Sequence, residues 1–303
     1  MDPLLAIGGF FVGVIVGLTG MGGGALMTPM LVLFFGVQPL AAVSSDLVTS
    51  AVMKPFGAAV HLRNGSVDRR LVKWLCLGSV PSAFGGVLLA RALGSGEQVQ
   101  TVIKTALGIA LLVAATALVV KAYLKLLEDR RGTAPTDPTA ITVRPVATLL
   151  AGAVGGLIVG MTSVGSGSLI IIALLGLYPA LKASDLVGTD IVQAVPLVLA
   201  AALGHILFGD LHLDVTLALL VGSVPGVIIG SLVSARAPGG VVRPVLGVVL
   251  VASGLKLLEV PTVATGVILV ALVLAAPPAW ILAHRYAPAA APRAPAEGTP
   301  TRV

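Results

Sequence analysis

The nine residues VGLTGMGGG (16–24) interrupt a run of apolar residues near the N-terminus. A glycine inside a helix costs roughly 1 kcal/mol relative to alanine, and an unpaired backbone group in lipid costs several kcal/mol. A glycine cluster inside an apolar run therefore persists where the backbone lines something polar. The stretch predicts a broken helix, whose second part begins with free N–H groups at the break.

A related stretch, VGMTSVGSGS (159–168), follows 143 residues later and also interrupts an apolar run. A shift of 144 residues aligns further pairs, namely Asp46 with Asp190, His61 with His205, and GSVP (78–81) with GSVP (222–225). Such a series of matches indicates two related halves with the same parts in the same order.

The composition shows which solvent surrounds the protein. Of the 303 residues, 57% are hydrophobic and 11% are charged, whereas a water-soluble domain is about 25% charged. A membrane-spanning helix needs roughly 20 mostly apolar residues, and the chain contains many such runs separated by short polar joints. No strand-like alternation occurs, which argues against a barrel. The sequence therefore predicts an all-α polytopic membrane protein.

Equivalent joints in the two halves carry opposite charge. The joint at residues 63–70 is basic, whereas its counterpart at residues 209–214 is acidic. Positively charged joints stay on the cytoplasmic side, so these two joints are expected on opposite sides of the membrane. This predicts two inverted-topology repeats, an arrangement common in secondary transporters, and a cytoplasmic C-terminus.

The apolar segments define the expected helices and domains. They lie at about 3–19, 24–36, 41–61, 71–93 and 101–125 in the first half, and at about 145–162, 168–178, 186–208, 213–235 and 241–258 in the second. One extra C-terminal helix, at about 262–284, has no counterpart. The expected units are a first repeat (1–127), a cytoplasmic linker (128–143), a second repeat (144–259), the extra helix (260–285) and a disordered cytoplasmic tail (286–303). Because the first two segments of each half are short, they form either two thin passes or a re-entrant hairpin of half-helices.

Each break is a candidate anion-binding site. The helix that restarts after a break points its free N–H groups and the positive end of its dipole at the break, so no arginine is required. The candidate substrate-binding residues of the breaks are Thr19, Gly20, Met21, Gly22, Gly23, Gly24, Thr162, Ser163, Gly165, Ser166, Gly167 and Ser168. The alternative is that the glycines only allow close helix packing.

Charged side chains inside the third apolar segment of each half form a second group of candidates. Asp46, Lys54 and His61 share one face of the expected helix with Ser50, and Asp190, Gln193 and His205 do the same in the second half. Charged residues in membrane segments mark a pathway or a coupling site. Lys54 is therefore a candidate substrate-binding residue, and Asp46, Asp190, His61 and His205 are candidate coupling or gating residues.

Each of these residues has a second interpretation. Asp46 and Asp190 are alternatively N-cap or first-turn residues that only stabilise helix starts. Lys54 alternatively snorkels or pairs with Asp46, and any role is confined to one half because its counterpart is Val198. The two histidines lie at helix ends beside charged joints, which favours interfacial positions over gating or proton handling.

On these motifs the sequence is similar to the TauE/SafE family of sulfite and organosulfonate transporters. The resemblance rests on the glycine stretch through Pro29, its echo at 160–168, SSD (44–46) and GTD (188–190), and the HxxxG joints at His61 and His205. It covers about residues 5–258. The resemblance implies transport of an oxidised-sulfur anion, although many members of the family have no assigned substrate.

The predicted function is a secondary transporter that carries sulfite or an organosulfonate across the cytoplasmic membrane. Half-helix N-termini hold the anion near the midplane, and alternating access exposes it to either side. A proton or another ion is the expected coupling ion, through Asp46 or Asp190. The alternatives are a channel-like anion pore, and a transporter of another anion such as thiosulfate or sulfate.

Other classes of protein are less well supported. The apolar segments hold no Glu/His pair, cysteine cluster or helical metal-ligand spacing, which argues against a membrane enzyme, so no catalytic residue, metal or cofactor is expected. A structural partner of another membrane complex is a further alternative. The basic residues lie next to apolar runs, which argues against nucleic acid binding. The expected partners are the lipid bilayer and a small anion, and a homodimer is considered as the oligomeric state.

Overall fold

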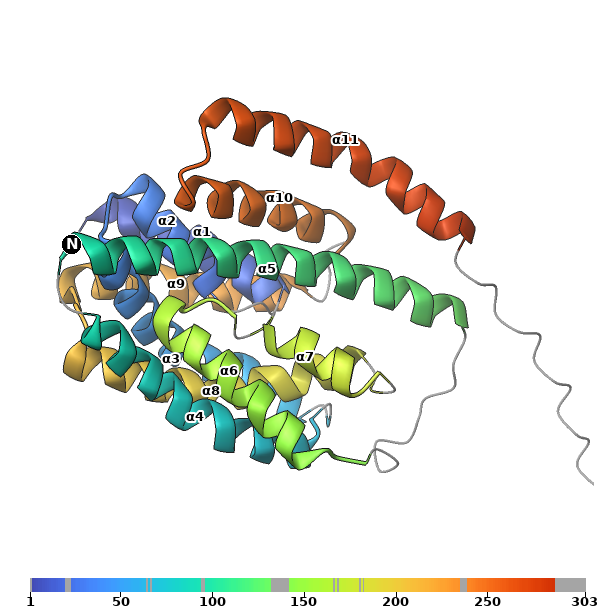
Figure 1. Cartoon of the computed structure of the whole chain (residues 1–303), viewed down its shortest axis with the longest axis horizontal. Coiled ribbons are helices and arrows are strands. Elements are labelled where there is room, and N and C mark those ends of the chain that lie inside the picture. Colours follow the sequence, from blue (N-terminus) through green and yellow to red (C-terminus); the bar gives the residue numbers. More distant parts are fainter. Residues whose placement is uncertain are drawn as a thin grey trace, which may run out of the picture.

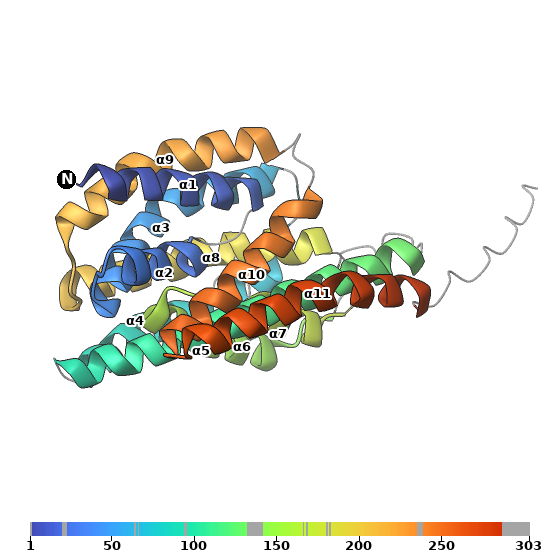
Figure 2. The same cartoon turned by 90° about the horizontal axis from the view of Figure 1, so that it is seen from above.

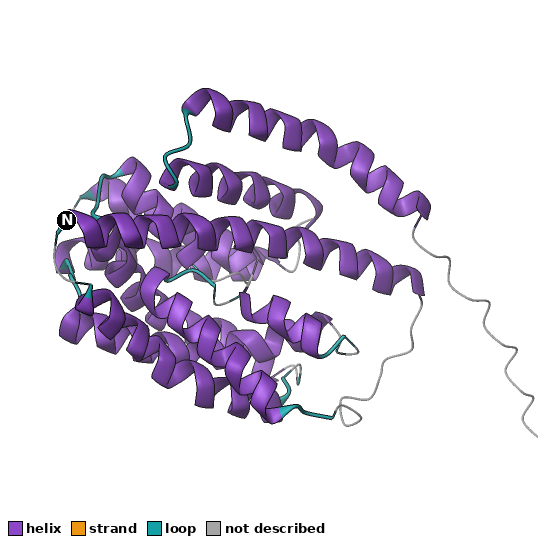
Figure 3. Cartoon of the chain, in the orientation of Figure 1, coloured by secondary structure: helices purple, strands orange, loops and turns teal. Residues whose placement is uncertain are grey.

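The structure is a computed structural model of the whole chain, and it describes residues 2–19, 23–63, 65, 67–93, 96–131, 142–165, 167, 169–179, 181, 183–234 and 239–286. This part of the chain consists of helices and short connecting loops, and it contains no strand (Figure 3). Within the same residues, five helices are long and apolar enough to cross a membrane. The prediction of an all-helical polytopic membrane protein is confirmed.

The helices follow the order expected from the apolar segments. The described residues of the first half form α1 (Pro3–Thr19), α2 (Gly24–Phe34), α3 (Pro39–Arg63), α4 (Arg69–Ala92) and α5 (Glu97–Arg131). Those of the second half form α6 (Pro145–Thr162), α7 (Leu169–Leu177), α8 (Ala183–Phe208), α9 (Leu213–Ser234) and α10 (Gly239–Leu257). The extra helix α11 (Thr262–Tyr286) follows.

The first two helices of each half form an antiparallel hairpin. Gly8 of α1 faces Met30 near the end of α2, since a Cβ atom on Gly8 would lie 2.8 Å from the Met30 sulfur. Gly155 of α6 faces Ile170 of α7 in a similar way. The eleven residues of α2 and the nine of α7 extend for about 16 Å and about 14 Å, roughly half of a 30 Å hydrocarbon core. The α6 helix is itself long and apolar enough to cross a membrane, so the choice between a re-entrant hairpin and two thin passes stays open.

Two parallel helix pairs, α1 with α9 and α4 with α6, each combine one helix from each half (Figures 1 and 2). Glycines at every fourth position let the backbones touch: a Cβ atom on Gly13 of α1 would lie 2.5 Å from the carbonyl oxygen of Ser223. The equivalent Gly156 of α6 meets the carbonyl oxygen of Ser79. The glycines with this role are Gly9, Gly13, Gly17, Gly152, Gly156 and Gly160. Close packing, which we considered for the break glycines, thus operates in the helices before the breaks, and Gly24 of the first break also packs against a backbone.

The equivalent helices α3 and α8 pack against each other and run antiparallel. Ser44, near the start of α3, contacts His205, near the end of α8, and the N–H of Asp68, beyond the end of α3, donates to Thr189, near the start of α8. This is the relation expected of inverted repeats.

Two helix bundles hold much of the apolar core. One cluster of buried residues comes from α1, α2, α3 and α9, and another joins the bundle of α4, α6, α7 and α8 and also includes residues of α3 and α5. The fourth helix of each half therefore packs into the bundle of the other half. A third cluster joins α5 and α10 to Ala25 and Val164, which flank the two breaks.

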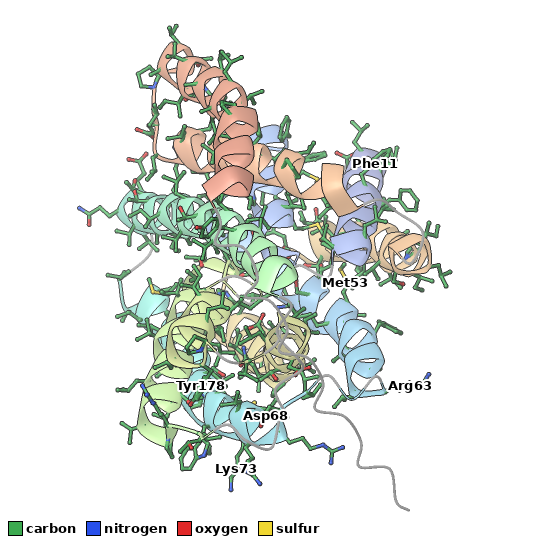
Figure 4. All side chains as sticks on the ribbon, turned by 90° about the vertical axis from the view of Figure 1, so that its right-hand side faces the viewer. Phe11, Met53, Arg63, Asp68, Lys73 and Tyr178 are labelled. Atoms are coloured by element: carbon green, nitrogen blue, oxygen red, sulfur yellow. The ribbon has the colours of Figure 1, made fainter. Side chains whose placement is uncertain are left out.

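The basic segments gather at one end of the molecule. The C-terminal ends of α5 and α11 both lie at the right in Figure 1. Figure 4 looks at this end and shows Arg63 and Lys73, from the basic joint between α3 and α4, pointing outward. The segments that the sequence predicts to be cytoplasmic thus share one end of the structure.

Candidate functional site

The two breaks meet in the interior. Gly24, the first residue of α2, packs directly against Ser163, which follows α6: a Cβ atom on Gly24 would fall on the Ser163 carbonyl oxygen and lie 2.8 Å from its hydroxyl. Gly24 and Ser163 are both buried. The breaks therefore face each other within the protein rather than lipid. Gly20, Met21, Gly22, Ser166 and Ser168 lie outside the described residues, and their part in the site stays a prediction.

The second break depends on left-handed backbone conformations. Ser163 has a φ of 58° and donates its N–H to the carbonyl oxygen of Val159 at 2.8 Å, which ends α6. Gly165 and Gly167 follow with φ values of 124° and 113°. Side chains other than hydrogen disfavour these conformations, so the glycines allow the chain to turn into α7.

The threonines of the two breaks bond to their own helices. The hydroxyls of Thr19 and Thr162 donate to the carbonyl oxygens of Ile15 and Ile158, in each case at 2.7 Å. These equivalent bonds use the single hydroxyl proton that each threonine could donate to an anion. The hydroxyl of Ser163 bonds to a residue of the other half, Asp46.

No residue of α2 itself caps or neutralises the start of the helix. Gly23 is the N-cap residue, no side chain caps the helix at this residue, and the first turn contains no acidic side chain. The Gly23 carbonyl oxygen accepts the N–H groups of Leu26 and Met27 at 2.9 and 2.8 Å. The positive end of the α2 dipole is therefore directed at the break without a capping side chain.

Asp46 reaches the first break and touches the second. Its Oδ2 atom accepts a hydrogen bond from Thr28 of α2 at 2.7 Å, and its Oδ1 atom accepts one from Ser50 at 3.2 Å. A Cβ atom on Gly23 would lie 3.6 Å from the same Oδ1 atom. Ser163 is a further hydrogen-bond partner of the carboxyl group. Because α3 begins at Pro39, the interpretation of Asp46 as an N-cap or first-turn residue is wrong.

Asp190 occupies the equivalent place in α8. It is fully buried, and its Oδ1 atom accepts a hydrogen bond from Gln193 at 3.4 Å. The Oε1 atom of Gln193 in turn accepts from Ser79 of α4 at 3.1 Å. Since α8 begins at Ala183, the N-cap interpretation is wrong for Asp190 too.

Lys54 lies in the middle of α3 and is partly buried. The negative charges of Asp190 and Asp46 both act on its ammonium group, that of Asp190 more strongly. The alternative in which Lys54 pairs with Asp46 alone is therefore incomplete, because the Lys54 ammonium interacts with a carboxyl group from each half.

His205 is a buried link between three helices. Its Nδ1 atom lies 2.8 Å from the hydroxyl oxygen of Ser44 on α3, and its Nε2 atom lies 2.8 Å from the carbonyl oxygen of Gly160 on α6. A carbonyl oxygen only accepts, so we assign the ring proton to Nε2. Nδ1 then accepts from the Ser44 hydroxyl, whose single proton is shared between this bond and the carbonyl oxygen of Leu40 at 2.9 Å. His205 is fully buried, and the interfacial interpretation is wrong for it. The side chain of His61 is not among those that the structure describes.

Two residues of the site were not predicted. Thr28 is a lone hydroxyl in the apolar helix α2, next to Pro29, and that isolation is a signal visible in the sequence. Ser79 belongs to the repeated GSVP motif, which we used only to align the halves. The structure thus brings Asp46, Thr28 and Ser163 together directly, and it connects Asp190 to α4 through Gln193.

Comparison with known proteins agrees with the resemblance found in the sequence. Residues 5–257 match the family described as "Sulfite exporter TauE/SafE". The probable membrane transporter protein YjnA of Bacillus subtilis (strain 168) is 40% identical over 261 residues, which cover 85% of this chain and 100% of that protein. The probable membrane transporter protein YdhB of the same organism is 25% identical over 252 residues, covering 82% of this chain and 97% of YdhB. No solved structure matches the chain.

Proposed function

The chain belongs to the sulfite exporter TauE/SafE family, and from this premise we propose that it carries a small oxidised-sulfur anion, sulfite or an organosulfonate, across the cytoplasmic membrane. Its relatives are named as membrane transporters. We propose that it too works as a secondary transporter rather than as an enzyme, and that the basic end of the molecule faces the cytoplasm together with the C-terminus.

The contact between Gly24 and Ser163 is the observation that carries this proposal, because it brings both breaks to one place. The anion binds there to the free N–H groups at the start of α2 and to the Ser163 hydroxyl, and the Lys54 ammonium supplies a full positive charge. Gly165 and Gly167 let the second backbone approach the anion closely.

We propose that alternating access uses movement of the two bundles relative to each other. The backbone contacts between α1 and α9, and between α4 and α6, make each pair move as one unit. Movement of the bundle α1, α2, α3 and α9 relative to the bundle α4, α6, α7 and α8 separates the breaks toward one side and then the other. The moving unit is therefore a bundle that combines both halves, not one half of the sequence.

Asp46 is the proposed coupling residue. An ionised carboxyl group beside Gly23 repels an anion at the break, whereas a protonated one has a hydroxyl to donate to it. Binding of the anion and binding of a proton then favour each other, because linkage between two sites is reciprocal. Asp190 is the equivalent group of the second half.

Flux measurements with purified protein in liposomes test the proposal. We expect saturable, protein-dependent movement of radiolabelled sulfite or of a short organosulfonate, and a decrease of roughly tenfold or more in Lys54→Met. Lys73→Met, which removes an exposed lysine of the basic end, is the matched control and should transport normally. Flux no greater than in empty liposomes for every sulfur anion, or normal flux in Lys54→Met, would overturn the proposal. Flux that does not saturate would replace alternating access with a pore.

A further inference from the structure

The carboxyl group of Asp46 is surrounded by hydroxyl donors at the first break. The Thr28 hydroxyl donates to its Oδ2 atom at 2.7 Å, and the Ser50 hydroxyl donates to its Oδ1 atom at 3.2 Å. The Ser163 hydroxyl, from the second break, is a further partner. All four side chains are buried. Donors from both halves of the chain thus hold one carboxyl group in the interior.

This carboxyl group also lies beside the start of α2. A Cβ atom on Gly23, the N-cap residue, would lie 3.6 Å from Oδ1 of Asp46 and 3.4 Å from the Ser50 hydroxyl oxygen. A Cβ atom on Gly24, the next residue, would lie 2.8 Å from the Ser163 hydroxyl oxygen. No side chain of α2 caps the helix at this end. The acidic group beside this helix start therefore comes from α3.

The surroundings of Asp46 are those of a bound oxyanion. Carboxylates, sulfonates and sulfite all present negatively charged oxygen atoms that only accept hydrogen bonds. Hydroxyl groups and the free N–H groups of a helix start are suitable donors to any of them. The two oxygen atoms of Asp46 also have separate partners, Thr28 on α2 and Ser50 on α3. A free oxyanion with two or more such oxygen atoms could make the same contacts.

These donors cannot serve two anions at once. A hydroxyl group has a single proton to donate, and those of Thr28 and Ser50 are directed at Asp46. In addition, two negative groups side by side in a low-dielectric interior repel each other strongly. The carboxylate and a second oxyanion therefore exclude each other from this group of donors.

We propose that the Asp46 carboxylate is a tethered competitor of the transported anion: it occupies the place of the anion at the first break and leaves Thr28 and Ser50 when an oxyanion binds there. The inference rests on the proposed function and describes how its site is regulated. A change of side-chain rotamer is enough to move the carboxyl group away from its present partners. Binding of the anion thus requires the displacement of a group that belongs to the protein.

The affinity of the purified protein for methanesulfonate at neutral pH gives the first test. Asp46→Asn removes the negative charge and keeps the shape, so we expect it to bind methanesulfonate roughly tenfold tighter than the wild type. Asp214→Asn makes the same change at an exposed position in the first turn of α9, and it should bind as the wild type does. Unchanged or weaker binding in Asp46→Asn would refute the inference.

A gain in Asp46→Asn would also follow if the carboxylate only repelled the anion from nearby, so Thr28 provides the decisive comparison. If the anion takes over the donors of Asp46, adding Thr28→Val to Asp46→Asn removes a donor to methanesulfonate. We then expect the double variant to bind roughly tenfold weaker than Asp46→Asn alone. Equal affinities of the double variant and Asp46→Asn would show that the anion does not use this donor, and would overturn the inference.

A structure of the wild type with a bound sulfonate tests the same point if a variant does not fold. We expect the Thr28 hydroxyl to lie within hydrogen-bond distance of a sulfonate oxygen and no longer of Asp46. A bound sulfonate with the bond between Thr28 and Asp46 intact would contradict the inference.

The outcomes separate this inference from the proposed function. If neither the wild type nor Asp46→Asn binds or transports methanesulfonate or sulfite, the proposed function is wrong, and the inference with it. If the wild type transports these anions and Asp46→Asn binds them no more tightly, anion transport stands and competition by Asp46 is wrong.

Discussion

The hydroxyl of Thr28 on α2 donates a 2.7 Å hydrogen bond to Oδ2 of Asp46 on α3, and both side chains are fully buried. This bond connects the helix that follows the first break to the carboxyl group that faces the break. It gives the hairpin α1–α2 a polar attachment to α3, in addition to the apolar contacts of the two helices.

Replacing Thr28 by Val keeps the shape of the side chain and removes the donor. We expect a loss of about 1–3 kcal/mol in stability, because a buried acceptor of Asp46 loses its partner. Thermal unfolding of the purified protein in detergent measures the change. Thr28→Ser retains the hydroxyl and is the control, and it should melt closer to the wild type. Melting of Thr28→Val at the wild-type temperature would show that the bond does not stabilise the protein.

Gly24→Ala places a methyl group on the backbone of Ser163. Neither backbone can shift without moving its break. We therefore expect a loss of stability at the upper end of the roughly 1–3 kcal/mol typical of overpacking, together with reduced transport. Gly85→Ala in α4 is the control, since nothing lies within 4 Å of the added atom. Normal flux and melting in Gly24→Ala would show that the breaks are not in contact.

Gly13→Ala and Gly156→Ala test the equivalence of the two helix pairs. Each added methyl group meets the carbonyl oxygen of an equivalent serine, Ser223 or Ser79. We expect similar destabilisation of about 1–3 kcal/mol in each, and effects in the double variant that add within about 0.5 kcal/mol. Gly247→Ala is the control, because its nearest neighbour is a Leu118 methyl group at 3.6 Å. A large effect in one variant and none in the other would contradict the equivalence.

His205→Phe removes both hydrogen bonds of the buried ring. The carbonyl oxygen of Gly160 then loses a partner, which costs about 1–3 kcal/mol, whereas the Ser44 hydroxyl still donates to the carbonyl oxygen of Leu40 at 2.9 Å. His205→Gln can replace one of the bonds, so we expect it to melt between the wild type and His205→Phe. Equal melting of all three proteins would show that the ring is not a link between the helices.

The ion pair of Lys104 and Glu259, 2.7 Å apart, makes the stability of the protein depend on pH in a known direction. The hydrogen bond from Lys104 and its positive charge lower the pKa of Glu259. A lowered pKa contributes stability that is present above the unfolded pKa and is lost as the pH falls through the folded pKa. Glu259→Gln should therefore melt slightly below the wild type at neutral pH and equally in acid, and high salt should remove the difference. A difference in melting temperature that grows in acid would contradict this direction.

The helices could be predicted from the sequence because their apolar runs end at polar joints, as between Arg63 and Arg69. The contact of Gly24 with Ser163 could not, since no pattern within either break specifies what it packs against. Asp46 was open to an N-cap interpretation because it follows two serines, but α3 starts earlier, at Pro39. His205 was expected at the interface because it precedes a charged joint, whereas its partners Ser44 and Gly160 come from distant parts of the chain.

The most direct measurement is the position of a bound anion. An experimental structure with a brominated short-chain sulfonate, located by the anomalous scattering of bromine, shows where the sulfonate group binds. We expect this group beside the contact of Gly24 with Ser163, within reach of Lys54 and the Asp46 carboxyl group. A sulfonate bound elsewhere in the transport path, with the two breaks packed together and unoccupied, would contradict the account.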